Sequence, residues 1–233
     1  LTSLELAEKS WQAERNYVGV KCGIMDQLSI TLGGGLNIRA KDLSFSSVSL
    51  ENSNCQIVIL DTLVPRKLIS SGYNSRYEEM LEVAEAIGLK SVNLIAGLNG
   101  VPKNLRPKLR ARLSHVLSEC YRVKRATKAI EMQDWSALGS LMNQSHASLK
   151  DDYEVSCREL DLLVELATVE RGVYGARMTG GGFGGCVVVL VETDQLEGVA
   201  DRISGQYDDR MGWAPGCYRV QAGAGAREIC AAL

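Results

Sequence analysis

Residues 178–186 read M-T-G-G-G-F-G-G-C, and this run decides the fold class of the chain. The apolar segment Cys186–Val191 follows the glycines and has the composition of a buried strand. A Rossmann fingerprint would need a helix at that point, and a Walker A loop would need Gly-Lys-Ser/Thr. The pattern therefore predicts a strand, a glycine turn and a second strand. With the helices expected before it, this indicates an α+β fold with helices on one face of a mostly antiparallel sheet.

The glycines of this run suggest more than a turn. Glycine alone tolerates a wide range of φ, and consecutive backbone N–H groups in such a run can converge on an anion or let a ligand approach the main chain. A tight structural turn would need only one or two glycines, so we favour a site-forming backbone over a plain turn. The residues concerned are Gly180, Gly181, Gly182, Gly184 and Gly185.

A second unusual stretch, residues 19–27, reads G-V-K-C-G-I-M-D-Q. It places one carboxylate, Asp26, shortly after Gly23 and before an apolar run that ends in the glycines 33–35. A carboxylate beside a tight backbone suits a general base for a hydroxyl group, or an anchor that orients one. An aspartate near a helix start is also commonly a cap, and the spacing by itself favours the cap.

The chain opens with a predicted helix that has a capping box from Thr2 to Glu5. Leu4, Ala7, Trp11 and Glu14 share one face of this helix because they lie three or four residues apart. On this pattern Glu14 is a solvated residue where the helix leaves the core. Because the chain begins at Leu1, directly in a helix, we expect it to be truncated at its amino terminus.

The other elements form two predicted regions, a first domain over residues 1–70 and a second over residues 71–233. In the first region, three strands are expected in one small antiparallel unit, and Pro65 begins the crossing to the second. In the second, helices precede the strand, glycine turn and strand, and Asp194 is expected to cap a later helix. The expected strands are 36–39, 45–50, 56–60 and 218–221, and the expected helices are 73–87, about 106–132, 134–149, 154–169 and 194–207.

Composition excludes several classes of protein. The chain has 233 residues, 45% of them hydrophobic and 23% charged, with a net charge of −2. With no Lys/Arg stripe, this balance argues against a nucleic-acid partner. The longest apolar run, Cys186–Val191, is too short to span a bilayer, and no leader pattern is present. The seven cysteines include no C-x-x-C pair, so we expect reduced thiols and a cytoplasmic location.

Three other polar features have structural interpretations. His115 and His146 fall within predicted helices and have no second His or Cys at metal-ligand spacing, so both are expected to be ordinary helix residues. Asp151 and Asp152 resemble a metal-binding pair. They lie between two predicted helices, where acidic residues favour the start of the second helix, so we favour capping and solvation.

The two unusual stretches resemble motifs of one family. Residues 18–27 are similar to the catalytic-aspartate motif of galactokinases, which belong to the GHMP small-molecule kinases, and residues 174–186 resemble that family's carboxy-terminal glycine motif. Between them, residues 73–76 and 148–156 are similar to galactokinase segments in the same order. The resemblance covers essentially the whole chain. It implies a remnant of a first α/β domain, followed by a helix-rich, ferredoxin-like carboxy-terminal GHMP kinase domain.

The resemblance implies an ATP-dependent enzyme that phosphorylates the anomeric hydroxyl of a galactose-type sugar, with ATP and Mg²⁺ as cofactors and no nucleic-acid or membrane partner. Asp26 matches the catalytic base, and Gly23 and Tyr73 match sugar-contacting positions. Glu14 falls where the family places a magnesium carboxylate, which reverses its interpretation as a solvated residue. The glycine motif would line the cleft between the two domains. Such a site fits phosphoryl transfer, which depends mainly on positioning and charge neutralisation.

The departures from the family leave alternatives open. The amino-terminal sugar motif, with its arginine and Glu-His-Thr-Asp run, and the Gly/Ser-rich phosphate loop are absent and would precede Leu1. We therefore expect the chain alone to be inactive and a longer parent to be the kinase. Gly72 replaces a common Glu and Lys21 a common Pro, so a galacturonate-type sugar is the competing substrate. A galactose and ATP sensor without turnover, or a fragment with no independent function, are further alternatives.

Overall fold

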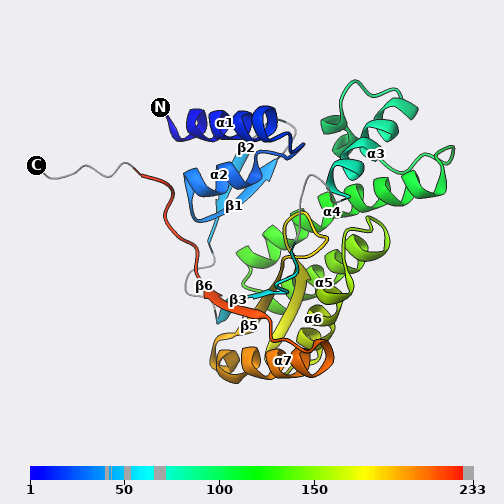
Figure 1. Cartoon of the computed structure of the whole chain (residues 1–233). Coiled ribbons are helices and arrows are strands. Elements are labelled where there is room, and N and C mark those ends of the chain that lie inside the picture. The colour runs from blue at the N-terminus through cyan, green and yellow to red at the C-terminus, as the bar shows by residue number, and fades with distance from the viewer. Residues whose placement is uncertain (40–41, 43, 50–53, 66–71, 228–233) are drawn as a thin grey trace, which may run out of the picture. The chain divides into compact units, whose positions relative to one another are not determined.

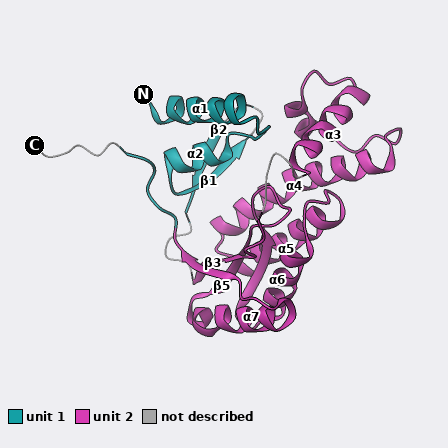
Figure 2. Ribbon diagram, viewed as in Figure 1, with its two compact units in different colours: residues 1–51, 222–233 teal, residues 52–221 magenta. Residues whose placement is uncertain are grey.

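The computed structural model describes residues 1–39, 42, 44–49, 54–65 and 72–227 (Figure 1). Contacts divide the chain into two compact units, residues 1–51 with 222–233 and residues 52–221 (Figure 2). This division does not coincide with the expected boundary near residue 70. The difference arises because the strand expected at 56–60 pairs in the second unit. Part of the crossing expected to begin at Pro65 lies outside the described residues.

The first unit contains helices and one hairpin. Its elements are α1 (Ser3–Ala13), the π-helical turn η1 (Glu14–Val18), α2 (Met25–Leu32), β1 (Gly35–Arg39) and β2 (Ser44–Val48). The predicted capping box is confirmed: the Thr2 hydroxyl accepts from the Glu5 amide at 3.2 Å, and the Thr2 amide donates to the Glu5 carboxylate at 2.8 Å. Ala7, Ile24 and Leu28 form the small core of this unit.

The chain returns to the first unit near its carboxyl terminus. The Gly34 amide donates to the carbonyl of Gly223 at 2.8 Å, and the Ala226 amide donates to the carbonyl of Ile30, also at 2.8 Å. Gly33 has a φ of +70°, and a Cβ there would lie 2.1 Å from the Gly225 nitrogen. Glycine at position 33 is therefore required by its positive φ and by the close approach of this returning segment.

The second unit is an antiparallel sheet with helices. Its strands are β3 (Cys55–Asp61), β4 (Val173–Met178), β5 (Cys186–Glu192) and β6 (Gly216–Val220), in the order β4-β5-β3-β6. Its helices are α3 (Tyr73–Ala86), the 3₁₀ turn η2 (Val92–Gly97), α4 (Pro107–Glu131), α5 (Trp135–Asp151), α6 (Arg158–Val169), the 3₁₀ turn η3 (Thr193–Gln195) and α7 (Leu196–Met211). The α+β prediction, including the strand, glycine turn and strand, is confirmed.

Three expectations about individual elements were wrong. β3 is an interior strand between β5 and β6, not the third strand of the amino-terminal unit. Helix α6 begins at Arg158 and not near residue 154, because Glu154 has a φ of +53°, outside the helical region. Asp194 lies in η3, and no side chain caps α7 at Gln195.

One face of the sheet carries the main core. Alternate residues of β5, namely Val187, Val189 and Val191, are fully buried, as the two-residue period of a strand requires. They pack with buried side chains of β3, β4, α6 and α7. A second cluster joins α3, η2 and α4 around Val83, Ile95 and Leu113. Of the helices described, none is both long and apolar enough to cross a membrane.

Helix α5 covers the outer edge of β4. The Asn143 side chain accepts from the Ala176 amide at 2.8 Å, and the imidazole Nδ1 of His146 accepts from the Met178 amide at 3.3 Å. These contacts pair strand amides that an edge strand would otherwise expose. The helix comes this close because Gly139 faces the strand: a Cβ there would lie 2.0 Å from the Tyr174 carbonyl oxygen.

We expect Gly139→Ala to lower the free energy of unfolding by about 3 kcal/mol, because the added methyl group forces α5 away from β4. The matched control is Gly205→Ala on α7, where a Cβ meets no atom within 4 Å. That change should raise stability by about 0.5–1 kcal/mol, since alanine favours a helix over glycine. Urea unfolding followed by circular dichroism measures both. Equal stability of Gly139→Ala and wild type would contradict the close crossing.

Candidate active site

Asp26 lies in the first turn of α2, exposed to solvent. The residue at the N-cap position is Ile24, and no side chain caps the helix. Asp26 is therefore not the cap that its spacing favoured. A carboxylate in the first turn of a helix is stabilised by the helix dipole. Its exposure leaves the group accessible to a ligand.

The loop before Asp26 is held by the preceding helix. The indole N–H of Trp11 and the guanidinium of Arg15 both donate to the carbonyl of Cys22, at 2.9 and 3.1 Å. The Arg15 guanidinium also lies 5.6 Å from the centre of the Trp11 ring. Two donors on one carbonyl restrict the backbone four residues before Asp26. Sequence patterns identified Trp11 only as an apolar residue of the helix face.

Gly23 follows that carbonyl and is exposed. A Cβ at Gly23 would meet no atom within 4 Å, and its φ is not in the left-handed region. Neither backbone conformation nor packing in the first unit therefore requires glycine here. Open space beside Gly23 is compatible with the sugar contact expected from the family resemblance.

Glu14 begins the π-helical turn and is half-buried. Its carboxylate accepts a hydrogen bond from the side-chain amide of Gln27, with Nε2 and Oε2 2.6 Å apart. Burial, and next the charge of Glu14, raises the pKa of the Cys22 thiol, with a smaller contribution from Asp26. The structure thus brings Glu14 and Asp26 near the same loop, although twelve positions separate them in the sequence.

No group of three or more His, Cys, Asp or Glu side chains with metal-binding geometry occurs among the described residues. Mg²⁺ is commonly held by one or two carboxylates together with substrate phosphates and water. The half-buried Glu14 carboxylate is a suitable hard oxygen ligand. Asp152 accepts from the Ser148 hydroxyl at 2.7 Å, and Asp151 is exposed at the end of α5, as its expected solvation requires. Asp152 also follows α5 directly instead of capping α6, so the capping interpretation was wrong.

In the second unit, the glycine turn is anchored on both sides. The Thr62 amide and hydroxyl both donate to the Gly185 carbonyl at 2.9 Å, and the Phe183 amide donates to the carbonyl of Val155 at 2.8 Å. Gly182 and Gly184 have positive φ, and a Cβ on Gly182 would lie 2.1 Å from the Val155 oxygen. Packing therefore accounts for part of the glycine content.

The tip of the turn differs from its anchored base. Gly182, Gly184 and Gly185 are buried, whereas Gly180 is exposed and Gly181 half-buried. Gly180 has a φ of +76° without being buried. The accessible backbone of the motif is thus confined to residues 180–181, and this part can approach a ligand.

Tyr73 is the first residue of α3 and is half-buried. Gly72, just before it, lies against the aromatic ring of Phe183 in the glycine turn, and a Cβ at Gly72 would lie 2.5 Å from the ring Cζ. The second unit therefore brings the helix start that carries Tyr73 next to the glycine motif. More than one hundred residues separate the two in the sequence.

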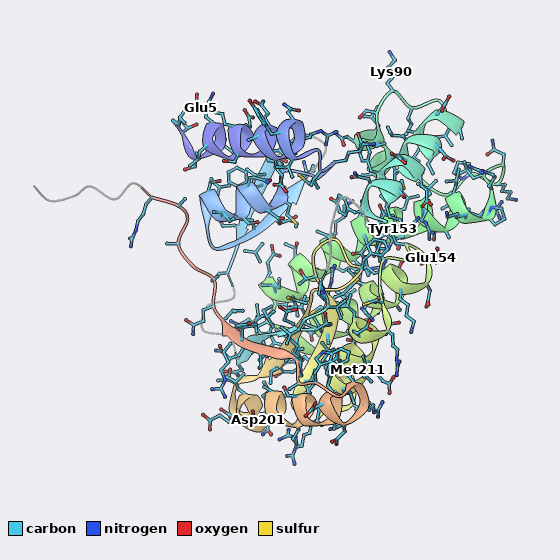
Figure 3. The ribbon with its side chains drawn as sticks, viewed as in Figure 1. Glu5, Lys90, Tyr153, Glu154, Asp201 and Met211 are labelled. Carbon is cyan, nitrogen blue, oxygen red and sulfur yellow. The ribbon has the colours of Figure 1, made fainter. Side chains whose placement is uncertain are left out.

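An ion network joins α3 to α4. The fully buried Arg112 donates from Nε to Glu79 at 2.8 Å and from Nη2 to Glu154 at 2.5 Å, and it also donates to the Asp152 carbonyl. Glu154 and Tyr153 follow the end of α5 (Figure 3). Although burial opposes ionisation of Glu79, hydrogen bonds from Arg76, Lys108 and Arg112 lower its pKa to about 2. Sequence periodicity did not identify this network.

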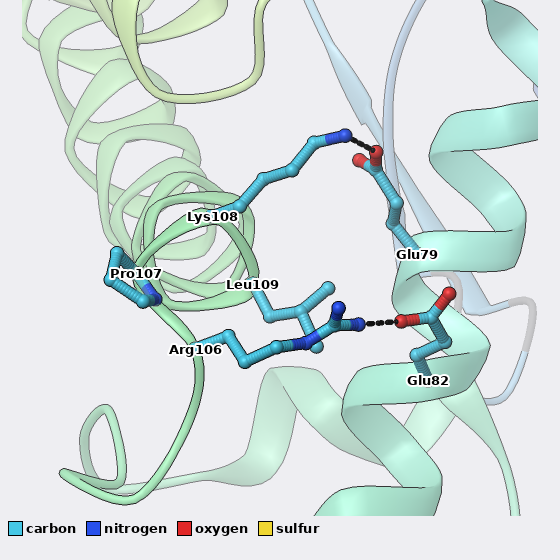
Figure 4. Close-up of a pocket in the computed structure, with 6 residues that line it drawn as sticks. All are labelled: Glu79, Glu82, Arg106, Pro107, Lys108 and Leu109. Carbon is cyan, nitrogen blue, oxygen red and sulfur yellow. Dashed lines mark hydrogen bonds and ion pairs between the residues drawn. The ribbon is translucent and has the colours of Figure 1, made fainter.

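A pocket between α3 and α4 contains part of this network (Figure 4). It is lined by Glu79, Glu82, Arg106, Pro107, Lys108 and Leu109. The side chain of Lys108 pairs with Glu79 at 2.6 Å, and Arg106 pairs with Glu82. None of the predicted site residues lines this pocket, and its charges are paired with one another, so it offers no candidate active site.

Both histidines have structural roles, as expected. Nδ1 of His115 lies 3.0 Å from the Ser148 hydroxyl, and its ring stacks on Tyr153 at a centroid distance of 4.5 Å. Burial lowers the pKa of His115 to about 4, so the ring is neutral at physiological pH. His146 pairs with Asp161 at 3.3 Å in addition to its contact with β4.

The chain is similar to known proteins in both sequence and fold. Residues 126–209 match the family model for the carboxy-terminal domain of GHMP kinases. The chain is 36% identical to a galactokinase of Clostridium beijerinckii, over 98% of the chain and 61% of the relative. It is 41% identical to a galactokinase of Canis lupus familiaris, over 96% of the chain and 57% of the relative. Residues 126–209 of this chain are therefore a GHMP kinase carboxy-terminal domain.

Solved structures of the family share the fold. Lactococcus lactis galactokinase, solved in complex with galactose, superposes with a TM-score of 0.91 at 34% identity, over 98% of this chain and 62% of that one. Mevalonate kinase of L. major, solved with R-mevalonate, gives a TM-score of 0.62 at 20% identity, over 96% of this chain and 60% of that one. The chain spans about three-fifths of the length of the curated galactokinases that it matches.

Proposed function

We propose that this chain forms the larger part of a galactokinase, which transfers the γ-phosphoryl group of ATP to the anomeric hydroxyl of galactose. Its similarity to galactokinases over nearly its whole length supports this proposal. The observation in the structure that carries it concerns Asp26, which is exposed in the first turn of α2 and does not cap that helix. The loop that precedes it is held by two side-chain donors.

In this mechanism, Asp26 accepts the proton of the sugar hydroxyl as that oxygen attacks the γ-phosphorus of ATP, the bond from the γ-phosphorus to the bridging oxygen breaks and ADP leaves. Gly23 leaves room for the sugar beside the loop, and the family resemblance makes Tyr73 a further sugar contact. The half-buried carboxylate of Glu14 would hold the magnesium ion. That ion, when bound, neutralises charge on the phosphates. The accessible glycine backbone at residues 180–181 would border the substrates.

Packing explains the glycine at position 72, where many galactokinases carry Glu. Any side chain there would collide with the Phe183 ring unless that ring moved, because a Cβ would lie 2.5 Å from it. Local packing against Phe183 therefore favours glycine at this position, and this preference does not depend on which sugar is bound. The departure at residue 72 is therefore no argument for a galacturonate-type acid.

We further propose that the protein is cytoplasmic and acts on small molecules. Six cysteines are free thiols in the part of the chain that the structure describes, as is usual for a reducing compartment. ATP, Mg²⁺ and a sugar are the expected ligands.

The test is a coupled ADP-release assay on the natural full-length protein, with ATP, Mg²⁺ and a panel of galactose, galactosamine, glucose and galacturonate. We expect turnover on galactose. Turnover restricted to galacturonate would support phosphoryl transfer from ATP but contradict galactose as the substrate. If calorimetry shows galactose binding but no sugar is turned over, the proposed enzymatic activity is contradicted and a sensor without turnover is favoured.

A further inference from the structure

Gln27 is the residue beside Asp26 whose side chain contacts Glu14. It lies in the first turn of α2 and is half-buried. Its Nε2 is 2.6 Å from Oε2 of Glu14. The opposite orientation of the amide would place two acceptors at that distance, so the donor must face the carboxylate. The contact joins α2, which carries the proposed base, to the turn that carries the proposed metal ligand.

The other end of the same amide has no protein partner. Oε1 of Gln27 is buried and accepts no hydrogen bond from the residues that the structure describes. A buried acceptor without a donor has lost its hydrogen bonds to water without replacing them, which destabilises the folded state. Such an atom is expected to find a donor in a bound molecule, since buried polar groups in folded proteins are almost always paired.

The segment between Glu14 and Gln27 is held in place. Trp11 and Arg15 fix the Cys22 carbonyl, and the side chains of Val20 and Ile24 are buried. The amide of Gln27 is therefore presented by a constrained backbone. Its nitrogen is held by Glu14, and its oxygen is left available to a donor from a bound molecule.

We propose that Gln27 is a positioning residue of the magnesium site: its amide nitrogen fixes the Glu14 carboxylate, and its buried oxygen accepts a hydrogen bond from a water of the hydrated ion. This inference rests on the proposed function, in which Glu14 holds Mg²⁺. Mg²⁺ usually keeps several of its waters in proteins, so donors for Oε1 arrive with the ion. Groups that orient a ligating carboxylate typically change metal affinity about 10–100-fold when they are removed.

The experiment measures binding of the Mn²⁺–ADP complex to the full-length protein by water-proton relaxation, and binding of metal-free ADP by calorimetry. We expect Gln27→Leu to weaken Mn²⁺–ADP binding about 10–100-fold and to leave metal-free ADP binding unchanged. Gln27→Asn, which keeps the amide but shortens its reach, should show a similar loss while preserving a polar side chain. Gln12→Leu, the same change at an exposed position of α1, is the matched control and should have no effect.

Glu14→Gln separates this inference from the proposed function. If Glu14→Gln weakens Mn²⁺–ADP binding and neither Gln27 variant does, the role of Gln27 is overturned and the metal ligand stands. If the wild type binds Mn²⁺–ADP no better than metal-free ADP, the inference is overturned as well. Absence of galactose turnover in the wild type would contradict the proposed function alone, because the metal-binding measurement does not depend on turnover.

Discussion

Asp26→Asn is expected to lower kcat on galactose about 10²–10⁴-fold, the range typical of a lost general base. Asparagine has nearly the same shape but cannot accept the proton of the sugar hydroxyl. Because Asp26 is exposed and caps no helix, the substitution should leave folding intact. Steady-state kinetics of the full-length protein measures kcat, and calorimetry measures galactose affinity, which should change little.

Asp209→Asn is the matched control, since Asp209 is an exposed aspartate on α7 in the second unit. It should retain wild-type kcat. If Asp26→Asn keeps kcat within about threefold of wild type, Asp26 is not the base. If kcat is unchanged and galactose affinity falls, Asp26 anchors the sugar and another group takes the proton.

Arg112→Met is expected to lower the free energy of unfolding by about 3–5 kcal/mol, the usual effect of removing one partner from a buried ion pair. Arg112 is fully buried and binds Glu79, Glu154 and the Asp152 carbonyl. Methionine fills part of the space but leaves the Asp152 carbonyl without this donor and the carboxylates without this positive charge. Urea unfolding followed by circular dichroism at neutral pH measures the loss.

Two further variants of α4 test this explanation. Arg112→Lys keeps the charge but cannot donate to three acceptors in different directions, so its stability should fall between wild type and Arg112→Met. Lys124→Met makes a comparable change at an exposed position and should stay within about 0.5 kcal/mol of wild type. A stability of Arg112→Met equal to that of Lys124→Met would show that the network contributes nothing to folding.

Much of the secondary structure was predictable from local patterns. The capping box at Thr2, the cap at Asp134 and the stop at Gly88 mark helix ends through contacts within a few residues. The glycine turn between β4 and β5 was predictable because both flanking strands are adjacent in the sequence. The resemblance to galactokinases also indicated the candidate roles of Asp26, which lies in the catalytic-aspartate motif, and of Glu14, which precedes it. Their roles remain proposals.

Other features depend on residues far apart in the chain. The partners of β3 are β5 and β6, more than one hundred residues downstream, so an apolar run alone could not assign it to the second unit. Gly72 is explained by Phe183, and Arg112, a charged residue on a helix, is buried because Glu79 and Glu154 meet it there.

The sequence by itself therefore determined which segments are helices and strands, where the glycine turn lies and which family the motifs resemble. Only the tertiary structure decided that Gln27 binds Glu14, that Trp11 and Arg15 hold the loop before Asp26, and that the glycine turn meets the helix of Tyr73. The physical reason is range. Helix caps and periodic burial depend on neighbours a few residues away, whereas strand pairing and side-chain hydrogen bonds depend on groups that only folding brings within about 3 Å of one another.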